Sequence, residues 1–328
     1  MLARTVENVY WLARYLERAE DTARLISVHT HLLLDLPAAV APGWLPLIDI
    51  TGSRALFDER RGAGAQRAEE REVVYFLVAD RGNPGSIVHS LSTVRENART
   101  LRDVLPAESW EEFNGFFMRF SEELPTGLAR RDRFEFLKRS VLISQTLTGM
   151  LEGTMSRNQA HTFMALGRDL ERADMTSRVI DVRCAQLRPD AAEPQAFETV
   201  QWMSVLHTLS GYEMYRLARR TRVERAGVLE FALRDTQFPR SCLTCLRDMQ
   251  RCLEELPRSG AVRERLATAH RFLADAELGA IEPAALHELI DQLQRHLTAV
   301  HEQISLTYFP QPSARPPSVR QLAAGAPA

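Results

Sequence analysis

Residues 16–24 read LERAEDTAR, and residues 170–178 read LERADMTSR, so six of the nine positions are identical. The two stretches lie 154 residues apart, and two flanking positions match at the same separation: Leu12 with Leu166 and Arg14 with Arg168. Apolar residues recur every three or four positions through the first stretch, which is the period of an amphipathic helix. The sequence therefore predicts two long helices that are copies of one ancestral helix.

A second pair of matching blocks follows downstream, at a separation of 155 residues. The matched positions are Val73, Phe76, Asp80, Pro84 and Ser86 with Val228, Phe231, Asp235, Pro239 and Ser241. Two blocks in the same order at nearly one separation predict tandem units over 1–158 and 159–308. We expect an all-α fold in which six helices from each unit form a single pseudo-symmetric bundle, because the matched helices would bury their apolar stripes against each other.

Each unit is expected to hold a long first helix, a tryptophan-bearing helix, a short helix and a helix that opens with Pro-x-Ser. The last two helices of each unit are predicted over 108–124 and 133–158, and over 259–275 and 283–308. The apolar run 73–78 (VVYFLV) is predicted to be helical because no partner strand is evident. The proline-rich tail, 309–328, is expected to be disordered and to lie outside the domain.

The helix from Pro84 is expected to start at Asn83, with Asn83 as the N-cap and Pro84 at the first helical position. Ser86 and Ser241 are expected to cap helix starts, and Asp80 and Asp235 to fix the turns before them. These positions are therefore interpreted as structural.

Composition limits the function classes. The chain has 328 residues with a net charge of −2, and 45% of its residues are hydrophobic, so nothing favours nucleic acid or an anionic membrane as a partner. The charged N-terminal helix does not resemble a signal peptide, and no apolar run is long enough to span a bilayer, which makes the cytoplasm the expected compartment. Lysine occurs once, so a Schiff-base or phosphate-binding lysine could only be Lys138.

A charged face runs along the first long helix, opposite its apolar seam. Helical geometry places Arg14, Glu17, Arg18 and Asp21 on this face. The second copy repeats the face with Arg168, Glu171 and Arg172, although Met175 stands where the first copy has Asp21.

Two interpretations of this face remain open. A solvated face would carry pairs within each helix, namely Arg14 with Glu17, Glu20 with Arg24, Arg168 with Glu171 and Asp174 with Arg178. A purpose-built polar centre would instead explain why the same arginines and glutamates recur position for position, since guanidinium forks bind carboxylate or phosphate in bidentate fashion.

Other polar stripes could supply further binding groups. Arg95, Arg99 and Arg102 share a face of the helix that follows Pro84, and a second stripe at helical spacing comprises Gln201, Ser204, Thr208, Tyr212, Tyr215 and Arg219. Nucleotide-binding glycine motifs are missing, and the histidines do not form Glu-x-x-His or H-E-x-x-H pairs. The C-x-x-C pair, Cys242 and Cys245, is interpreted as small buried residues. No cofactor or metal site is predicted.

Several separated motifs resemble one family. They are the Trp-Leu-x-Arg run leading into Glu-Arg (11–18), N-P-G-S (83–86), R-E-N-A-R (95–99), W-E-E-F-N (110–114), G-R-D-L-E-R-A-D (167–174) and P-R-S (239–241). Together they look like the bacterial alpha-E family, and the resemblance spans about 1–308. It marks Glu17-Arg18 and Glu171-Arg172 as signature residues. It also implies genetic association or fusion with circularly permuted ATP-grasp ligases, in which the ligase binds ATP and forms an amide or peptide-like bond.

Three hypotheses for function stay open. The first is a helical accessory or partner subunit of such a ligase, whose polar centre holds an anionic small molecule or peptide through Arg14, Arg18, Arg168 and Arg172, with Arg95, Arg99 and Tyr212 as further binding residues. The second is a stand-alone enzyme for a carboxylate or phosphate substrate, with Glu17 or Glu171 as general base. The third is a structural or interaction protein whose Glu-Arg network only latches the two units together.

Overall fold

The computed structural model describes residues 1–38, 40–61, 68–186, 195–279 and 281–310, and all regular structure in these ranges is helical. The first half contains α1 (Ala3–Asp35), α2 (Leu45–Ile50), α3 (Arg54–Arg61), α4 (Glu70–Val78), α5 (Ile87–Thr100), α6 (Ala107–Gly127) and α7 (Arg133–Thr154). The second half contains α8 (Gln159–Gln186), α9 (Gln195–Thr208), α10 (Tyr212–Arg219), α11 (Arg225–Leu229), the π-helical turn η1 (Glu230–Arg234), α12 (Cys242–Glu254), α13 (Gly260–Ala274) and α14 (Pro283–Tyr308).

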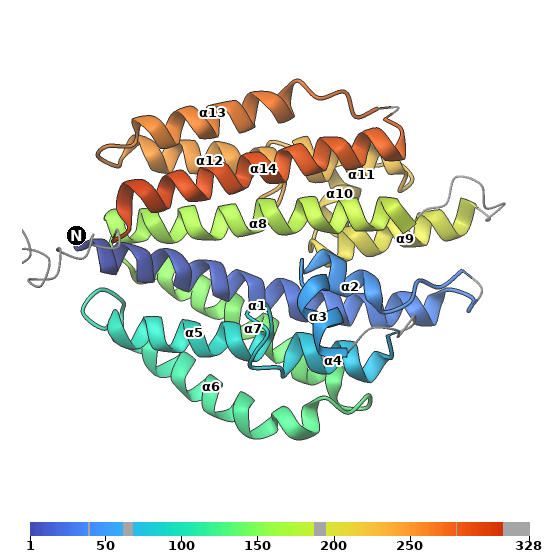
Figure 1. The fold of residues 1–328 in the computed structure, drawn as a ribbon, viewed down its shortest axis with the longest axis horizontal. Helices are drawn as coiled ribbons and strands as arrows, with labels where there is room; N and C mark the ends of the chain where they lie inside the picture. The colour runs from blue at the N-terminus through green and yellow to red at the C-terminus, as the bar shows by residue number, and fades with distance from the viewer. Residues whose placement is uncertain (39, 62–67, 187–194, 280, 311–328) are drawn as a thin grey trace, which may run out of the picture.

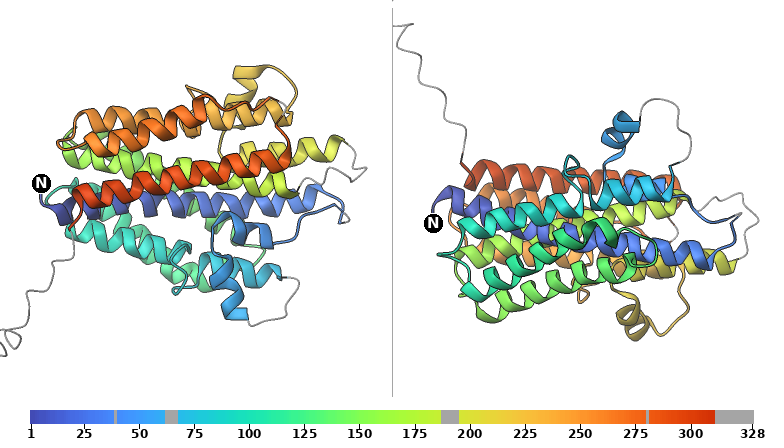
Figure 2. Two further views of the ribbon diagram at one scale, coloured as in Figure 1. Left: turned by 45° about the horizontal axis from the view of Figure 1, so that its top comes forward. Right: turned by 90° about the horizontal axis from the view of Figure 1, so that it is seen from below.

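The two longest helices, α1 and α8, lie side by side at the centre of the bundle (Figure 1). They run in the same direction, because Tyr10 lies beside Gly167 near their starts and His29 contacts Arg183 near their ends. Helices α5 and α7 pack on α1, with α6 outside them. Helices α12 and α14 pack on α8, with α13 outside them, so the α1–α8 contact lies between two helical layers (Figure 2).

The all-α prediction is confirmed. The expected last two helices of each unit are present, with ends that differ from the predicted ones by a few residues. The count of six helices per unit is too low: within the described residues, 1–158 and 159–308 each contain seven α-helices. The short helices α3 and α10 lie in segments where the sequence lacks a long apolar period. The organisation into two related units stays a prediction, and most of the predicted disordered tail lies outside the described residues.

Helix α1 is buried on both of its faces. The apolar seam is covered as expected, since Leu12, Leu16 and Ala23 are at most 5% exposed. On the opposite face, Glu17 and Asp21 are each only 3% exposed. The solvated-face interpretation is therefore wrong for these residues, because α8 covers the charged face of α1.

Gly167 lets α1 and α8 approach closely. A Cβ atom at this position would lie 2.4 Å from the carbonyl oxygen of Tyr10, and a backbone atom cannot rotate away as a flexible side chain would. The short approach aligns the charged residues that follow on both helices. Glycine at 167 thus serves packing between the two central helices.

Replacing Gly167 with alanine is expected to lower the free energy of unfolding by about 1–3 kcal/mol, the usual cost of forcing an extra carbon into a packed core. The matched control is Gly149→Ala on α7, where a Cβ would meet no atom within 4 Å. That control should raise stability by roughly 0.5–1 kcal/mol, because alanine favours helices over glycine. Urea denaturation measures both, and equal effects of the two substitutions would contradict the close approach.

The turn before α5 corrects the predicted helix start. Helix α5 begins at Ile87 with Ser86 as N-cap, and the Ser86 hydroxyl accepts a hydrogen bond from the His89 amide at 3.2 Å. Asn83 is used differently: its amide group donates to the Phe76 carbonyl at 3.0 Å and accepts from the Gly85 amide at 2.9 Å. Ser241 occupies the equivalent N-cap of α12, but its side chain makes no capping bond.

Two further predictions have clear outcomes. The run 73–78 lies within α4, so its assignment as helix is confirmed. The polar stripe from Gln201 to Arg219 does not lie on one helix, because α9 ends at Thr208 and α10 begins at Tyr212. Between them Ser210 adopts a positive φ of 55°, a left-handed conformation that ends a helix. Helical spacing alone could not reveal that break.

Candidate functional site

The charged residues of α1 and α8 pair across the helix interface. Glu171 accepts hydrogen bonds from Arg14 Nε at 2.7 Å, from Arg18 Nε at 2.5 Å and from Arg18 Nη2 at 3.0 Å. In the reverse direction, Glu17 accepts from Arg172 Nε at 2.9 Å. Each glutamate of the Glu-Arg signature therefore binds arginine from the other long helix. We call the group formed by these residues and by Glu20, Asp21, Arg24 and Arg240 the Glu-Arg centre.

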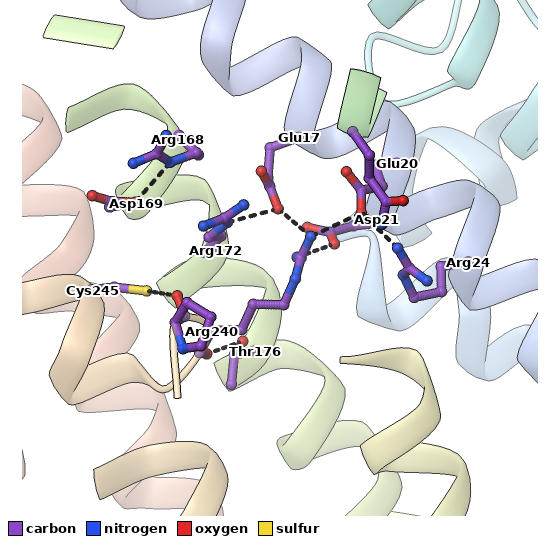
Figure 3. A network of polar contacts seen from close by, with 12 residues as sticks. Glu17, Glu20, Asp21, Arg24, Arg168, Asp169, Arg172, Thr176, Arg240 and Cys245 are labelled. Carbon is purple, nitrogen blue, oxygen red and sulfur yellow. Dashed lines mark hydrogen bonds and ion pairs between the residues drawn. The ribbon is translucent and has the colours of Figure 1, made fainter. Parts of the chain in front are cut away.

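Arg240 extends the centre from outside the two long helices (Figure 3). Its guanidinium lies 2.6 Å from Glu17, 3.0 Å from Glu20 and 2.7 Å from Asp21. Glu20 is also paired with Arg24, at 2.6 Å. One arginine thus bridges three carboxylates on successive turns of α1.

The loop that carries Arg240 is itself held against α8. The Thr176 hydroxyl donates to the Arg240 carbonyl at 2.9 Å, and the Cys245 thiol lies 3.5 Å from the Pro239 carbonyl (Figure 3). Because main-chain contacts fix this loop, the Arg240 side chain is positioned before it meets the carboxylates of α1. The centre therefore joins α1, α8 and the segment leading into α12.

Arg168 belongs to a neighbouring and more exposed cluster. It pairs with Glu152 at the end of α7, at 2.8 Å, and with Asp169 at 3.1 Å. Glu152 is also bound by Arg157 at 2.5 Å and by His161 at 3.2 Å. This cluster connects α7 to α8 beside the Glu-Arg centre.

The electrostatics of the two signature glutamates favour their charged forms. Burial acts to raise the pKa of Glu171, but the Arg18 and Arg14 guanidiniums outweigh it and lower the pKa to about 2. Burial likewise opposes ionisation of Glu17, yet Arg172 and Arg240 hold its pKa below the usual value. Because these pKa values lie below those of an unfolded chain, the ion pairs contribute stability above about pH 4.5 that is lost as the pH falls toward 2.

The pKa of Asp21 is shifted in the opposite direction from the pKa values of Glu17 and Glu171. Burial raises its pKa from 3.8 to about 7, with Arg240 opposing and the carboxylates of Glu17 and Glu20 adding to the rise. Its second oxygen, Oδ2, is buried and has no hydrogen-bond partner among the described residues. Folding therefore takes up a proton at Asp21 between about pH 4 and pH 7, and the stability contributed by this group falls as the pH rises through that window.

Asparagine at position 21 should remove this pH dependence. At pH 5 protonated Asp21 and the amide are close in shape and charge, whereas at pH 8 the wild-type protein must bury an ionised carboxylate. We expect the stability of Asp21→Asn relative to wild type to increase from pH 5 to pH 8. Chemical denaturation at both pH values checks this, with the half-exposed Asp291→Asn as control. A stability difference that stays constant between pH 5 and pH 8 would contradict the raised pKa.

The predicted pairings within each helix are only partly correct. Glu20 with Arg24 and Asp174 with Arg178 do pair along their helices, at 2.6 and 3.0 Å. The other two predicted pairs are wrong, since Arg14 binds Glu171 and Arg168 binds Glu152 and Asp169. Contacts between helices replace the predicted local pairs: Arg14 of α1 reaches Glu171 of α8, and Arg168 of α8 reaches Glu152 of α7.

Three other predicted binding residues lie apart from the Glu-Arg centre. Arg95 donates to Asn114 at 2.8 Å and so joins α5 to α6, whereas Arg99 forms an exposed pair with Glu96 within α5, at 3.0 Å. Tyr212, at the start of α10, stacks on His207 with ring centroids 4.4 Å apart. The structure does not bring these three residues together with Glu17 or Glu171.

Arg240 is the residue that the sequence prediction missed. The signal was present in the repeat itself: at the separation of 155 residues, Arg240 stands where the first copy has Gly85. Its neighbours Pro239 and Ser241 match, so the arginine departs from the repeated pattern. That departure marks a role found in one half only.

The space beside the Glu-Arg centre is small. A cavity of about 20 Å³ lies between α1, α7 and α8 and is lined in part by Glu17, Glu20, Glu152, His161 and Arg168. This volume holds about one water molecule. This cavity has no room for a metabolite.

The described residue ranges contain neither a metal-binding cluster nor a membrane-spanning helix. In those ranges no three His, Cys, Asp or Glu side chains gather in a geometry that could hold a metal ion. Cys242 and Cys245 are buried on α12, as predicted. Within the same ranges, every helix is too short or too polar to cross a bilayer.

The fold and the centre define an all-helical protein built around a buried Glu-Arg pairing. Sequence comparison agrees, because residues 1–309 match the Alpha-E family, described as a predicted alpha-helical domain with a conserved ER motif. The chain belongs to the Alpha-E family.

Similar sequences include uncharacterized proteins of Mycobacterium bovis and Mycobacterium tuberculosis, each 27% identical over 348 residues. The match covers 96% of this chain but only 38% of those relatives. No solved structure matches significantly.

Proposed function

We propose that this chain is a helical partner domain for a separate catalytic module, and that its Glu-Arg centre is a structural latch between α1 and α8. One observation carries the second part: every carboxylate of the centre is already paired with a guanidinium of this chain, and every guanidinium with a carboxylate. Glu171 is held by two arginines, and Arg240 by three carboxylates. An anionic ligand would have to displace carboxylates of this chain from their arginines.

The proposed latch fits the energetics of buried charge. Two oppositely charged groups that are removed from water together gain little net stability, but removal of one partner is costly. Such pairs specify which surfaces meet and in which register, as polar residues do within coiled coils. Here the reciprocal pairs would fix the parallel alignment of α1 and α8.

The stand-alone enzyme is less well supported. A general base works best with a pKa near the working pH. The pKa of Glu171 lies at about 2, and that of Glu17 is lowered too, so both carboxylates hold a proton weakly. Their low basicity suits ion pairing better than proton abstraction.

The proposed partner comes from the family resemblance and is consistent with the lengths of the relatives. More than half of each mycobacterial relative lies outside the matched region, so a domain of this kind is joined to other segments there. The resemblance implies a circularly permuted ATP-grasp ligase as the catalytic module. We propose that this chain assists such a ligase in forming an amide or peptide-like bond.

Co-expression tests the partnership. The tagged chain is co-expressed with the circularly permuted ATP-grasp ligase of the same organism, and the complex is measured by size-exclusion chromatography with light scattering. A defined stoichiometric complex and a changed rate of ATP turnover by the ligase are expected. A ligase that elutes alone, with the same ATP turnover in the presence and absence of this chain, would contradict the proposal.

A further inference from the structure

A groove of about 590 Å³ opens between α1, α7 and α9. Arg24 lines it and connects it to the Glu-Arg centre, because Arg24 pairs with Glu20 and Glu20 also pairs with Arg240. Its volume falls within the usual range of small-molecule sites. Most of its lining is apolar and comes from all three helices: Val28, Leu32, Phe134, Val141, Val200 and Met203. Phe134 is 46% exposed, so a large aromatic surface faces solvent.

The polar groups of the groove are mainly basic. Arg24, Lys138, His31 and His207 line it, and among the lining residues that the structure describes Asp35 is the only carboxylate. Lys138 is the single lysine of the chain and is half-exposed, with Glu135 3.7 Å away on the same helix. The two imidazoles offer hydrogen-bond donors whether neutral or charged.

The packing of α7 on α1 places Lys138 beside the basic residues of α1. Phe134 of α7 packs on His31 of α1, and Gln145 of α7 contacts Glu20 of α1, so the two helices run antiparallel. Lys138 lies between these two contacts in the sequence of α7. It therefore stands at a level of α1 between His31 and Arg24.

Arg24 adds an unused donor. Its Nη2 is bound to Glu20 at 2.6 Å, but its Nε is buried and has no hydrogen-bond partner among the described residues. A buried donor without an acceptor is costly, so a rotation of the Arg24 side chain that brings Nε to the groove would let an acceptor of the ligand remove that cost. Arg24 thus has unused hydrogen-bonding capacity.

We propose that the groove binds a small amphipathic carboxylate, with its apolar body against Phe134 and Met203 and its carboxylate toward Lys138 and Arg24. Lys138 and Arg24, as neighbouring cationic groups in an otherwise largely apolar groove, match a ligand that has one anionic end. The proposal goes beyond the partner-domain function and does not depend on it. Binding would be measured on the isolated chain, and a failure of the ligase complex would leave it intact.

Isothermal titration calorimetry with 2-naphthoate tests the proposal, and 2-naphthalenemethanol serves as the neutral probe of similar shape. One equivalent of naphthoate should bind saturably, with at least about tenfold weaker binding of the alcohol, because a hydrogen bond to a charged group contributes more than one to a neutral group. Absence of saturable naphthoate binding, or equal affinity for the two probes, would overturn the proposal.

Two variants locate the binding. Lys138→Gln should weaken naphthoate binding about tenfold. The matched control Arg139→Gln alters the next residue of α7, which pairs with Glu123 away from the groove, and should leave the affinity unchanged. Val200→Trp should abolish binding by filling the groove while the helical circular dichroism is retained. Naphthoate binding that neither Lys138→Gln nor Val200→Trp weakens would place it elsewhere and overturn the assignment.

Discussion

Replacement of Arg240 by methionine is expected to lower the free energy of unfolding by about 3–5 kcal/mol, the cost of leaving buried charge uncompensated. Arg240 is 7% exposed and contacts three carboxylates of α1, each only 3% exposed. Glu17 keeps Arg172 and Glu20 keeps Arg24 in the variant. Asp21 is left without an ion-pair partner among the described residues, so at pH 8 the variant has to bury an uncompensated carboxylate or protonate it.

The matched control for Arg240→Met is Arg295→Met. Like Arg240, Arg295 contacts more than one carboxylate, here Glu288 and Asp291, but its side chain is 61% exposed. Exposed pairs contribute about 0–1 kcal/mol, so this control should change stability little. Urea denaturation of both variants gives the comparison. A loss of less than about 1 kcal/mol for Arg240→Met would show that water reaches its carboxylate partners.

The substitution Glu171→Gln should cost a comparable amount, about 3–5 kcal/mol, because it leaves two arginines facing one neutral amide. Arg14 is 8% exposed, and both guanidiniums donate to the same carboxylate. The two hypotheses for this residue predict opposite results. A general base would lose turnover in the glutamine variant with little change in stability, whereas a latch loses stability directly.

The exposed Glu96 provides a matched control for Glu171→Gln. Glu96 also lies between two arginines, Arg95 and Arg99, but its side chain is 53% exposed. Glu96→Gln should therefore shift the unfolding free energy by about 0–1 kcal/mol. Similar losses at the two positions would mean that burial does not set the cost, contrary to the proposed latch.

Much of the fold could be predicted because its helices carry strong apolar periods. The matching stretches at 16–24 and 170–178 identified both central helices, and the last helices of each half were placed within a few residues. The short helix α3 escaped prediction, since two turns carry little periodicity, and α10 was joined to α9 because its polar residues continue the helical spacing. The start of α5 was misplaced because Asn83 and Ser86 are both good capping residues, and only three-dimensional contacts assign Asn83 to the turn.

The candidate site was predictable in its residue types but not in its pairings. The recurrence of arginine and glutamate in both copies favoured a polar centre on the charged face. Helical spacing then suggested an ion pair between Arg14 and Glu17. The structure pairs Arg14 with Glu171 instead, because two charged faces that are buried together find partners across the interface. Arg240 could not be placed from spacing, since it lies in a loop and meets α1 only through the tertiary fold.

The most direct test of the latch is a double-mutant cycle for Glu17→Gln and Arg172→Met, measured by urea denaturation. Their side chains are 2.9 Å apart and join α1 to α8. A buried pair that holds the two helices together should show a coupling free energy of about 2–3 kcal/mol, near the upper end for contacting residues. A coupling below about 0.5 kcal/mol, as expected for independent sites, would contradict the latch.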